Sequence, residues 1–280
     1  MKVLVTGVKG QLGFDVVKCL YEQGIEFISS NDIDLTNEEE TSIFIRDYLP
    51  DVVVHCAAYT DVDRAEVEAE KCRKVNVDST ARIASLCNEL GSKLVYISTD
   101  YVFSGEGTDP YEIYSEVGPK SIYGQTKLAG EKEVIFRLQR YFIIRTSWSF
   151  GINGDNFVKT MLRLTEDHEV IKVVSDQVGS PTYTFDLARL IVEMLQTEKY
   201  GVYHATNEGF CSWAEFASEI FIQTNKKTRV EFVKSHEYSS RADRPKNSKL
   251  SKSSLELSGF NRLPHWKEAL ARYLIEFNTK

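Results

Sequence analysis

The chain has 280 residues, with 34 basic and 41 acidic side chains and a net charge of −7. This length fits one large domain, or a large and a small one. The acidic balance argues against a nucleic-acid partner, and the sequence contains no apolar run long enough to span a membrane. The five cysteines include no Cys-x-x-Cys pair, which favours reduced thiols and a cytoplasmic protein.

The first element is a short β-branched apolar run, residues 2–6, which predicts a buried strand. It leads into a loop that carries Gly7, Gly10 and Gly13, followed by an amphipathic helical pattern. Glycines allow a tight turn and close backbone approach, and a helix N-terminus offers N–H groups to a phosphate. The spacing is Gly-x-x-Gly-x-x-Gly rather than Gly-x-Gly-x-x-Gly. Its position at the first strand-to-helix junction favours a pyrophosphate site over a simple turn.

A second strand is predicted over residues 25–30, and its end should lie near the adenine ribose of a dinucleotide. An acid there would hold the 2′-hydroxyl of NAD, whereas an arginine would accept the 2′-phosphate of NADP. The strand ends in Ser29 and Ser30, and the acids Asp32 and Asp34 come later. The sequence therefore leaves the choice between NADH and NADPH open.

Three further apolar runs, residues 51–58, 93–99 and 141–147, predict strands separated by helical patterns. This alternation predicts an α/β fold with a doubly wound parallel sheet of the Rossmann type. Ligands of such sheets bind outside the carboxyl ends of the strands. Small or polar residues stand at those ends: Thr6 and Gly7, Ala57 and Ala58, Ser98 and Thr99, and Thr146, Ser147 and Trp148.

Tyr123 and Lys127 lie four residues apart in a segment predicted to be helical, residues 123–138. Residues with this spacing share one helix face, so the phenol and the ammonium should point into the same space. A free tyrosine has a pKa of about 10 and is a poor proton donor at neutral pH, and a nearby cation would lower that pKa. Taken alone, the spacing is more typical of an interface tyrosine and a solvated lysine. The strand ends around it favour a catalytic pair.

The segments become shorter after Trp148. We therefore expect a dinucleotide-binding core of residues 1–148, partly joined by residues 170–207. Residues 149–169 and 208–280 should form a smaller, interleaved C-terminal substrate domain.

Two other features have both a structural and a functional interpretation. Residues 241–246 concentrate cations in an acidic protein. They could form a solvated loop or a clamp for an anionic group, because arginine matches the geometry of phosphate. Asn76 lies in a predicted helix that runs to about Leu90, where a polar residue is usually on the surface, but its position is near the inward face.

Together these motifs resemble the dTDP-4-dehydrorhamnose reductases, a family of the extended short-chain dehydrogenase/reductase superfamily. The resemblance spans nearly the whole chain, including the C-terminal part. It rests on residues 10–13, 55–63, 98–103, 123–131, 145–148, 156–161, 176–182, 212–217 and 244–248.

The resemblance implies reduction of the 4-keto group of dTDP-4-dehydro-L-rhamnose, a nucleotide sugar, by NADPH or NADH. Tyr123 would donate a proton to the former carbonyl oxygen, and Thr99 would hydrogen-bond the same oxygen. Lys127 would lower the pKa of Tyr123 and hold the nicotinamide ribose. The cofactor is expected to contact Gly7, Gly10, Gln11, Leu12, Gly13, Asp34, Leu35, Ala57, Ala58, Tyr59, Asn76, Tyr123 and Lys127. The nucleotide sugar is expected to contact Thr99, Asp100, Tyr101, Trp148, Arg241 and Arg244.

The family also leaves a metal and the oligomeric state open. Some members bind a divalent ion such as Mg²⁺ through glutamates at a dimer interface. Asp15 follows the glycine loop, but no partner acid for it can be identified, so no metal site is assigned. A monomer and a homodimer are both compatible with the sequence.

Two other functions compete with the reductase. A nucleotide-sugar dehydratase typically needs Asp-Glu after the threonine, and Tyr101 in place of the glutamate argues against dehydration; a 4-epimerase is less cleanly excluded. A non-catalytic subunit that kept the reductase fold, as in methionine adenosyltransferase, is the other alternative. The intact Tyr123 and Lys127 argue against it, because a binding protein has no need of a proton donor.

Overall fold

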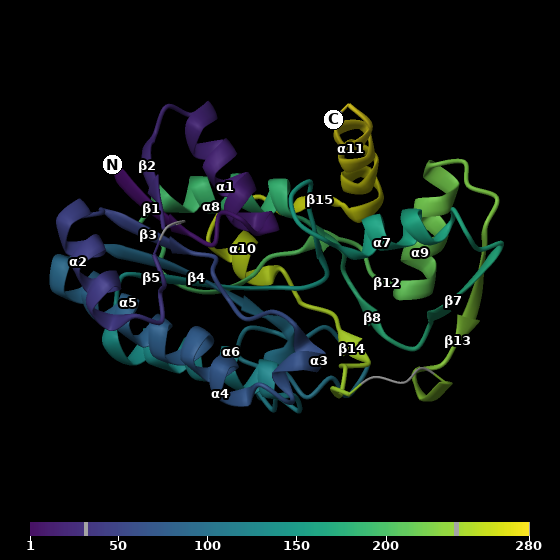
Figure 1. Ribbon diagram of the computed structural model, residues 1–280, viewed down its shortest axis with the longest axis horizontal. Helices are drawn as coiled ribbons and strands as arrows, with labels where there is room; N and C mark the ends of the chain where they lie inside the picture. The colour runs from purple at the N-terminus through teal and green to yellow at the C-terminus, as the bar shows by residue number, and fades with distance from the viewer. Residues whose placement is uncertain (31–32, 238–240, 280) are drawn as a thin grey trace.

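The computed structural model describes residues 1–30, 33–237 and 241–279. Its centre is a six-stranded sheet in the order β10-β5-β4-β3-β1-β2, in which every neighbouring pair is parallel (Figure 1). The predicted doubly wound parallel sheet is therefore confirmed. Its strands are β1 (Lys2–Thr6), β2 (Glu26–Ser29), β3 (Val52–His55), β4 (Lys93–Thr99), β5 (Tyr141–Thr146) and β10 (Gly201–His204).

Helices cover both faces of this sheet (Figure 1). Because successive side chains of a strand point to opposite faces, Val3 and Val5 of β1 belong to one apolar cluster and Leu4 to another. The first cluster lies under α1 (Gln11–Glu22) and α8 (Thr184–Leu195). The second lies under α2 (Glu38–Tyr48), α5 (Ser79–Leu90) and α6 (Ile122–Arg137).

The connection from β3 to α5 is made of short helical pieces. They are α3 (Val62–Ala65), α4 (Ala69–Arg73) and a π-helical turn, η1 (Lys74–Asp78). Such π turns are rare and are frequently found at functional sites. This one contains Asn76, which is almost fully buried. A single 3₁₀ turn, η2 (Asp100–Val102), follows β4.

A smaller part lies beside the sheet and has its own apolar core, which includes Phe150, Phe216 and Tyr273. Its helices are α7 (Phe157–Leu164), α9 (Trp213–Gln223) and α11 (Trp266–Asn278). Its paired strands are β6 (Ser149–Phe150) with β9 (Thr182–Tyr183), β7 (Val170–Val174) with β13 (Arg229–Val233), and β11 (Asn207–Glu208) with β15 (Leu263–His265). Its three-stranded sheet has the order β12 (Cys211–Ser212), β8 (Val178–Gly179), β14 (Asn247–Ser248). A 3₁₀ turn, η3 (Ser235–Glu237), follows β13.

The two parts interleave differently from the expected boundaries. We expected residues 208–280 to belong wholly to the smaller part, but α10 (Ser253–Leu257) packs on β10 of the main sheet. Leu255 and Phe260 are buried in the core of that sheet, and the Phe260 ring contacts Tyr203 at a centroid distance of 5.7 Å. The segment around α10 packs on the main sheet because its apolar side chains cover an apolar surface beside the edge strand β10.

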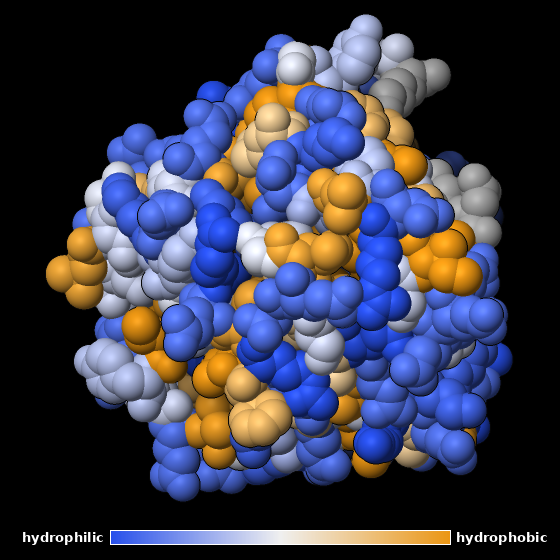
Figure 2. Space-filling view, turned by 90° about the vertical axis from the view of Figure 1, so that its left-hand side faces the viewer, coloured by the Kyte–Doolittle hydropathy of each residue, from blue (hydrophilic) through white to orange (hydrophobic). Residues whose placement is uncertain are grey.

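The surface is mixed in character. Figure 2 shows the face at the β2 end of the molecule, where hydrophilic residues predominate and apolar residues are scattered among them. In the part of the chain that the structure describes, no helix combines the length and the apolar character needed to cross a membrane.

A buried ion pair fastens α6 to the sheet. Arg145 of β5 donates from Nε and Nη2 to the two carboxylate oxygens of Glu131 at 2.9 and 2.7 Å. Ser98 of β4 donates to the same carboxylate at 2.5 Å. Glu131 and Arg145 are only 2% and 5% exposed, so water contributes little to solvating either charge. The pair therefore connects α6 to two adjacent strands.

We predict that Glu131→Ala lowers the free energy of unfolding by about 3–5 kcal/mol, because it leaves the Arg145 guanidinium buried without its counter-charge. Urea unfolding followed by circular dichroism measures this loss. Glu89→Ala is the matched control, since it breaks the exposed two-point pair between Arg46 and Glu89. An equal loss in the free energy of unfolding in the two variants would show that the buried Glu131 pair is no more important for stability than the exposed Glu89 pair.

Candidate active site

A cavity of about 870 Å³ opens at the carboxyl ends of the sheet strands. Its wall combines the glycine loop after β1, the ends of β3, β4 and β5, the start of α6, and residues of the smaller part. The cavity brings together most of the residues proposed from the sequence. They are Gly7, Gly10, Gln11, Leu12, Gly13, Asp34, Leu35, Ala57, Ala58, Thr99, Asp100, Tyr101, Tyr123, Lys127 and Trp148.

The glycine loop is shaped for close approach of a ligand. Gly7 has φ +69°, and a Cβ on it would lie 2.6 Å from the backbone nitrogen of Ala57. Its carbonyl accepts the N–H of Gly10 at 2.9 Å, which closes the turn. Gly10 is the N-cap of α1 and has no side chain to cap it. The first N–H groups of α1 therefore remain available to an anionic group such as a phosphate.

Asn76 has a different position from the one expected of a cofactor contact. Among the described residues, neither Asn76 nor Tyr59 is part of the cavity lining. Asn76 Oδ1 accepts the N–H of Tyr59 at 2.8 Å, and its Nδ2 donates to the carbonyl of Tyr59 at 3.1 Å. The amide therefore pairs with the backbone just after Ala57 and Ala58. This arrangement holds the loop that lines the cavity, while the Tyr59 hydroxyl donates to Glu68 at 3.0 Å.

Two polar contacts fix the first turn of α6. Ser121 is the N-cap and accepts the N–H of Gly124 at 3.1 Å. Glu66 accepts the N–H of Ile122 at 2.8 Å from a neighbouring loop. Two of the unpaired N–H groups at the helix start are thus satisfied, and Tyr123 is held in the second helical position.

Tyr123 and Lys127 both line the cavity from α6, as their spacing predicts. Burial raises the pKa of Tyr123, and the neighbouring Thr99 hydroxyl opposes that rise. Burial also lowers the pKa of Lys127 to about 7, against the attraction of Glu131. The Lys127 Nζ lies 4.0 Å from the centroid of the Tyr96 ring.

Burial therefore moves the pKa of Tyr123 in the opposite direction to the one expected from Lys127. Desolvation dominates both groups: it disfavours the phenolate of Tyr123 and the ammonium of Lys127. The sequence shows the spacing of the two residues but not the extent of their burial. A raised pKa keeps Tyr123 protonated at neutral pH, which is the state that a proton donor needs.

The end of β4 and the 3₁₀ turn that follows it contribute Thr99, Asp100 and Tyr101 to the cavity lining. The Thr99 hydroxyl donates to Asp100 Oδ1 at 3.1 Å. Burial raises the pKa of Asp100 to about 6 and that of Tyr101 to about 12. The rings of Tyr101 and Tyr123 meet edge to face at a centroid distance of 5.5 Å. Hydroxyl and carboxyl groups therefore converge on the phenol of Tyr123.

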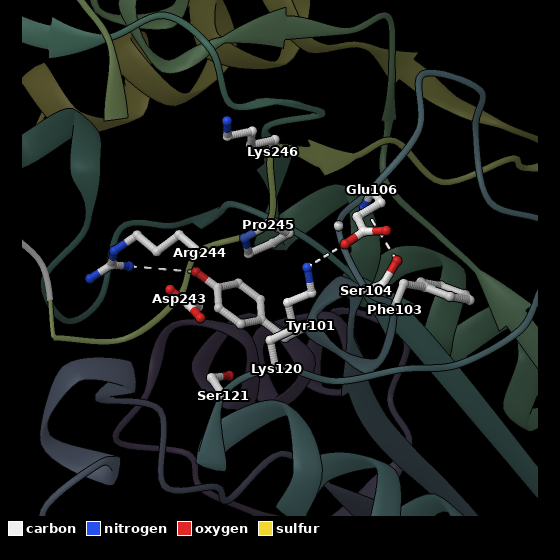
Figure 3. A pocket seen from close by; sticks show the side chains of 11 residues that line it. Tyr101, Phe103, Ser104, Glu106, Lys120, Ser121, Asp243, Arg244, Pro245 and Lys246 are labelled. Atoms are coloured by element: carbon white, nitrogen blue, oxygen red, sulfur yellow. Dashed lines mark hydrogen bonds and ion pairs between the residues drawn. The ribbon is translucent and has the colours of Figure 1, made fainter. Parts of the chain in front are cut away.

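A second cavity of about 330 Å³ adjoins Tyr101 and is shown in Figure 3. Lys120, Arg244 and Lys246 contribute cations to its lining. In Figure 3 the Arg244 guanidinium points toward the Tyr101 hydroxyl, to which it donates at 3.5 Å. Lys120 is paired with Glu106 at 2.6 Å. Glu106 and Asp243 also line the cavity, so its three cations exceed its carboxylates by one.

Arg241 is placed differently from Arg244. Its side chain is exposed, and among the described residues it is absent from the linings of both cavities. Its backbone N–H donates to Asp63 at 3.0 Å, and the same carboxylate forms an ion pair with Arg244. Asp63 thereby ties the start of the cationic segment to α3.

The sequence analysis missed several lining residues. Trp213 lines the cavity from α9, which begins with a capping box formed by Ser212 and Glu215. Asn156 also reaches the cavity from the smaller part. The sequence spacing of Trp213 and Asn156 does not indicate that they lie close to the strand ends of the main sheet. Lys9 and Thr146 could have been proposed, since they lie in the glycine loop and at a strand end.

Within the described ranges, no group of three or more His, Cys, Asp or Glu side chains is arranged to hold a metal ion. Asp15 is buried, and its carboxylate accepts the hydroxyl of Thr184 at 2.5 Å.

The chain has many relatives. The family described as "RmlD substrate binding domain" matches residues 1–279. The spore coat polysaccharide biosynthesis protein SpsK of Bacillus subtilis is 41% identical, over 98% of this chain and 97% of its own length. The dTDP-4-dehydrorhamnose reductase of Escherichia coli is 34% identical, over 100% of this chain and 99% of its own length.

Solved structures agree with these relatives. A dTDP-4-dehydrorhamnose reductase of Clostridium acetobutylicum has a TM-score of 0.97 and 41% identity, covering 99% of this chain and 100% of that chain. One of Bacillus anthracis, in complex with NADP, has a TM-score of 0.96 and 42% identity, covering 98% and 99%. A UDP-glucose 4-epimerase of Thermus thermophilus shares the fold at 20% identity. The chain therefore belongs to the RmlD substrate-binding-domain family, in which the dTDP-4-dehydrorhamnose reductases fall.

Proposed function

We propose that the chain is an NAD(P)H-dependent reductase that converts dTDP-4-dehydro-L-rhamnose to dTDP-L-rhamnose. One observation carries the proposal: Thr99, Tyr123 and Lys127 line the same cavity as the glycine loop. A proton donor thus stands within the same space as a dinucleotide site. The full-length similarity to reductases of this substrate supports the choice of sugar.

The residues present fit a nicotinamide dinucleotide. Gly7 leaves no space for a side chain beside Ala57, and the N-terminus of α1 would hold the pyrophosphate. Ala57 and Ala58 would allow the cofactor close to the backbone, and Lys127 would contact the nicotinamide ribose. The bound cofactor supplies the hydride that reduces the C4 carbonyl. A relative at 42% identity was solved with NADP, and we propose that this chain uses NADPH or NADH.

The side chains around the reacting oxygen donate a proton to it and stabilise its negative charge. Tyr123 donates a proton to that oxygen, and its raised pKa keeps the proton in place until the oxygen becomes basic. The Thr99 hydroxyl lies beside Tyr123 and can donate a second hydrogen bond to the same oxygen. Lys127, when charged, stabilises the negative charge that develops there.

The nucleotide sugar would span both cavities. The sugar would lie between Asp100, Tyr101 and Trp148, which line the larger cavity. Arg244, with Lys246 beside it, would neutralise part of the diphosphate from the smaller cavity. Arg241, exposed on the same segment, would act on the diphosphate at longer range.

The direct test is loss of nicotinamide absorbance with enzymatically prepared dTDP-4-dehydro-L-rhamnose, using NADPH and NADH in parallel. Formation of dTDP-L-rhamnose supports the proposal and gives the cofactor preference. A chain purified with stoichiometric tightly bound NAD would instead favour a 4-epimerase, which retains its cofactor. Folded protein that binds nucleotide but oxidises neither cofactor would favour another keto sugar or a non-catalytic subunit.

We predict that Tyr123→Phe lowers kcat by about 100-fold or more, because it removes only the hydroxyl that donates the proton. Steady-state kinetics measure the loss, and NADPH binding by fluorescence should stay within about twofold, since the ring remains. Tyr200→Phe is the control: its hydroxyl accepts from Arg140 on the protein surface. Turnover of Tyr123→Phe within about threefold of the wild type would exclude Tyr123 as the donor.

We also predict that kcat/KM for NADPH is level below about pH 7 and falls above it, because this parameter follows the free protein and Lys127 has a pKa of about 7. The sign follows from the charge: deprotonation at higher pH removes the cation. The charged or titratable groups that act on Lys127 are Glu131, Cys56 and Cys72.

Lys127→Arg tests that assignment, because arginine stays charged throughout. Its rate should be lower than that of the wild type, but the fall above about pH 7 should disappear. An unchanged alkaline fall in Lys127→Arg would assign the titration to another group.

A further inference from the structure

Trp148 has an unusual backbone. It lies two residues after the end of β5 with φ +49°, in the left-handed region that a bulky side chain rarely adopts. Such a conformation persists only where the surrounding contacts hold it, and it is found preferentially at functional sites. Trp148 also lines the larger cavity. The contacts that hold its indole therefore bear on the shape of the site.

The first of those contacts comes from the smaller part of the molecule. The Trp148 and Trp213 rings stack at a centroid distance of 3.7 Å with an interplanar angle of 13°. Phe157 of α7 in turn packs on Trp213 at 4.6 Å. Trp213, which itself borders the cavity, thus contacts both Phe157 and the indole of Trp148.

The second contact comes from Gly179 of β8. A Cβ on this glycine would lie 2.8 Å from Cε2 of Trp148 and 3.0 Å from Cβ of Ser248. Real Cβ atoms do not approach other heavy atoms as closely as the first of these distances. Because φ at Gly179 is not in the left-handed region, the need for glycine here comes from the indole and not from the turn.

We infer that Trp213 is a positioning residue for the sugar site, and that together with Gly179 it fixes the indole of Trp148 at the cavity wall. Trp148 alone would have to hold an unfavourable backbone conformation and a single side-chain orientation. The stack on Trp213 and the close contact with Gly179 together allow the indole of Trp148 a single orientation. The inference rests on the proposed function in one respect, which is that Trp148 contacts the sugar.

The stack itself can be observed without substrate. Two indoles stacked at this distance couple their transitions and give an exciton couplet in the far-ultraviolet circular dichroism spectrum. The chain has three tryptophans, and only two of them are stacked on each other. We expect the couplet in the wild type, its loss in Trp213→Leu and Trp213→Phe, and its retention in Trp266→Leu. A wild-type couplet that persists in Trp213→Leu would overturn the inference.

The functional consequence is a selective change in KM. Trp213→Leu should raise KM for dTDP-4-dehydro-L-rhamnose about tenfold, with KM for NADPH within about twofold, because the indole contacts only the sugar. Trp213→Phe should restore most of the loss, since a ring still packs there. Trp266→Leu is the matched control: Trp266 lies in the same apolar core and packs on Phe216 at 5.6 Å, away from Trp148.

Gly179→Ala approaches the same indole from the other side and leaves Trp213 intact. It should also raise KM for the nucleotide sugar and leave KM for NADPH unchanged, so it decides the matter if Trp213→Leu does not fold. An unchanged sugar KM in both variants, or a parallel rise of both KM values as in a damaged core, overturns the positioning role. A wild type that shows the couplet but does not turn over dTDP-4-dehydro-L-rhamnose overturns the proposed function instead, and with it the sugar assignment.

Discussion

The ion pair between Glu131 and Arg145 is the interaction on which the site depends most. It joins α6, which carries Tyr123 and Lys127, to β5, and through Ser98 to β4. The same carboxylate stabilises the charged form of Lys127, so it acts on geometry and on electrostatics. A buried pair of this kind adds little net stability over an apolar contact, but it permits only one alignment of the elements that it connects.

A second set of polar contacts lies outside the lining of the two cavities. Asn76 pairs with the Tyr59 backbone, Glu66 holds the start of α6, and Asp63 binds the 241–244 segment. Each uses an amide or carboxylate to satisfy backbone N–H groups that would otherwise lack a partner. The lining residues can therefore be small or reactive, because other residues hold their backbone in place.

The sequence predicted the parts of the fold that depend on local patterns. The limits of β1 and β4 agree with the structure, and the apolar alternation and glycine loop placed the site at the strand ends. The direction of the Tyr123 pKa could not be predicted, because burial competes with charge and only the fold gives the extent of burial. Trp213 was missed because its neighbours in space are remote in sequence. The pairing of Asn76 with the Tyr59 backbone was missed because the spacing of Asn76 shows its helix face but not its partner.

The wall of the proposed sugar site is shared between two parts of the chain. Trp148 follows a strand of the main sheet, Gly179 belongs to β8 and Trp213 to α9. The indole of Trp148 fits only because Trp213 stacks on it and because Gly179 has no Cβ. This sharing limits how the family can diversify by recombination. Exchange of the C-terminal segment with that of a distant relative would import a new partner for Trp148 while keeping the old residue at position 179. New sugar specificities in this scaffold therefore require coordinated substitutions on both sides of the junction.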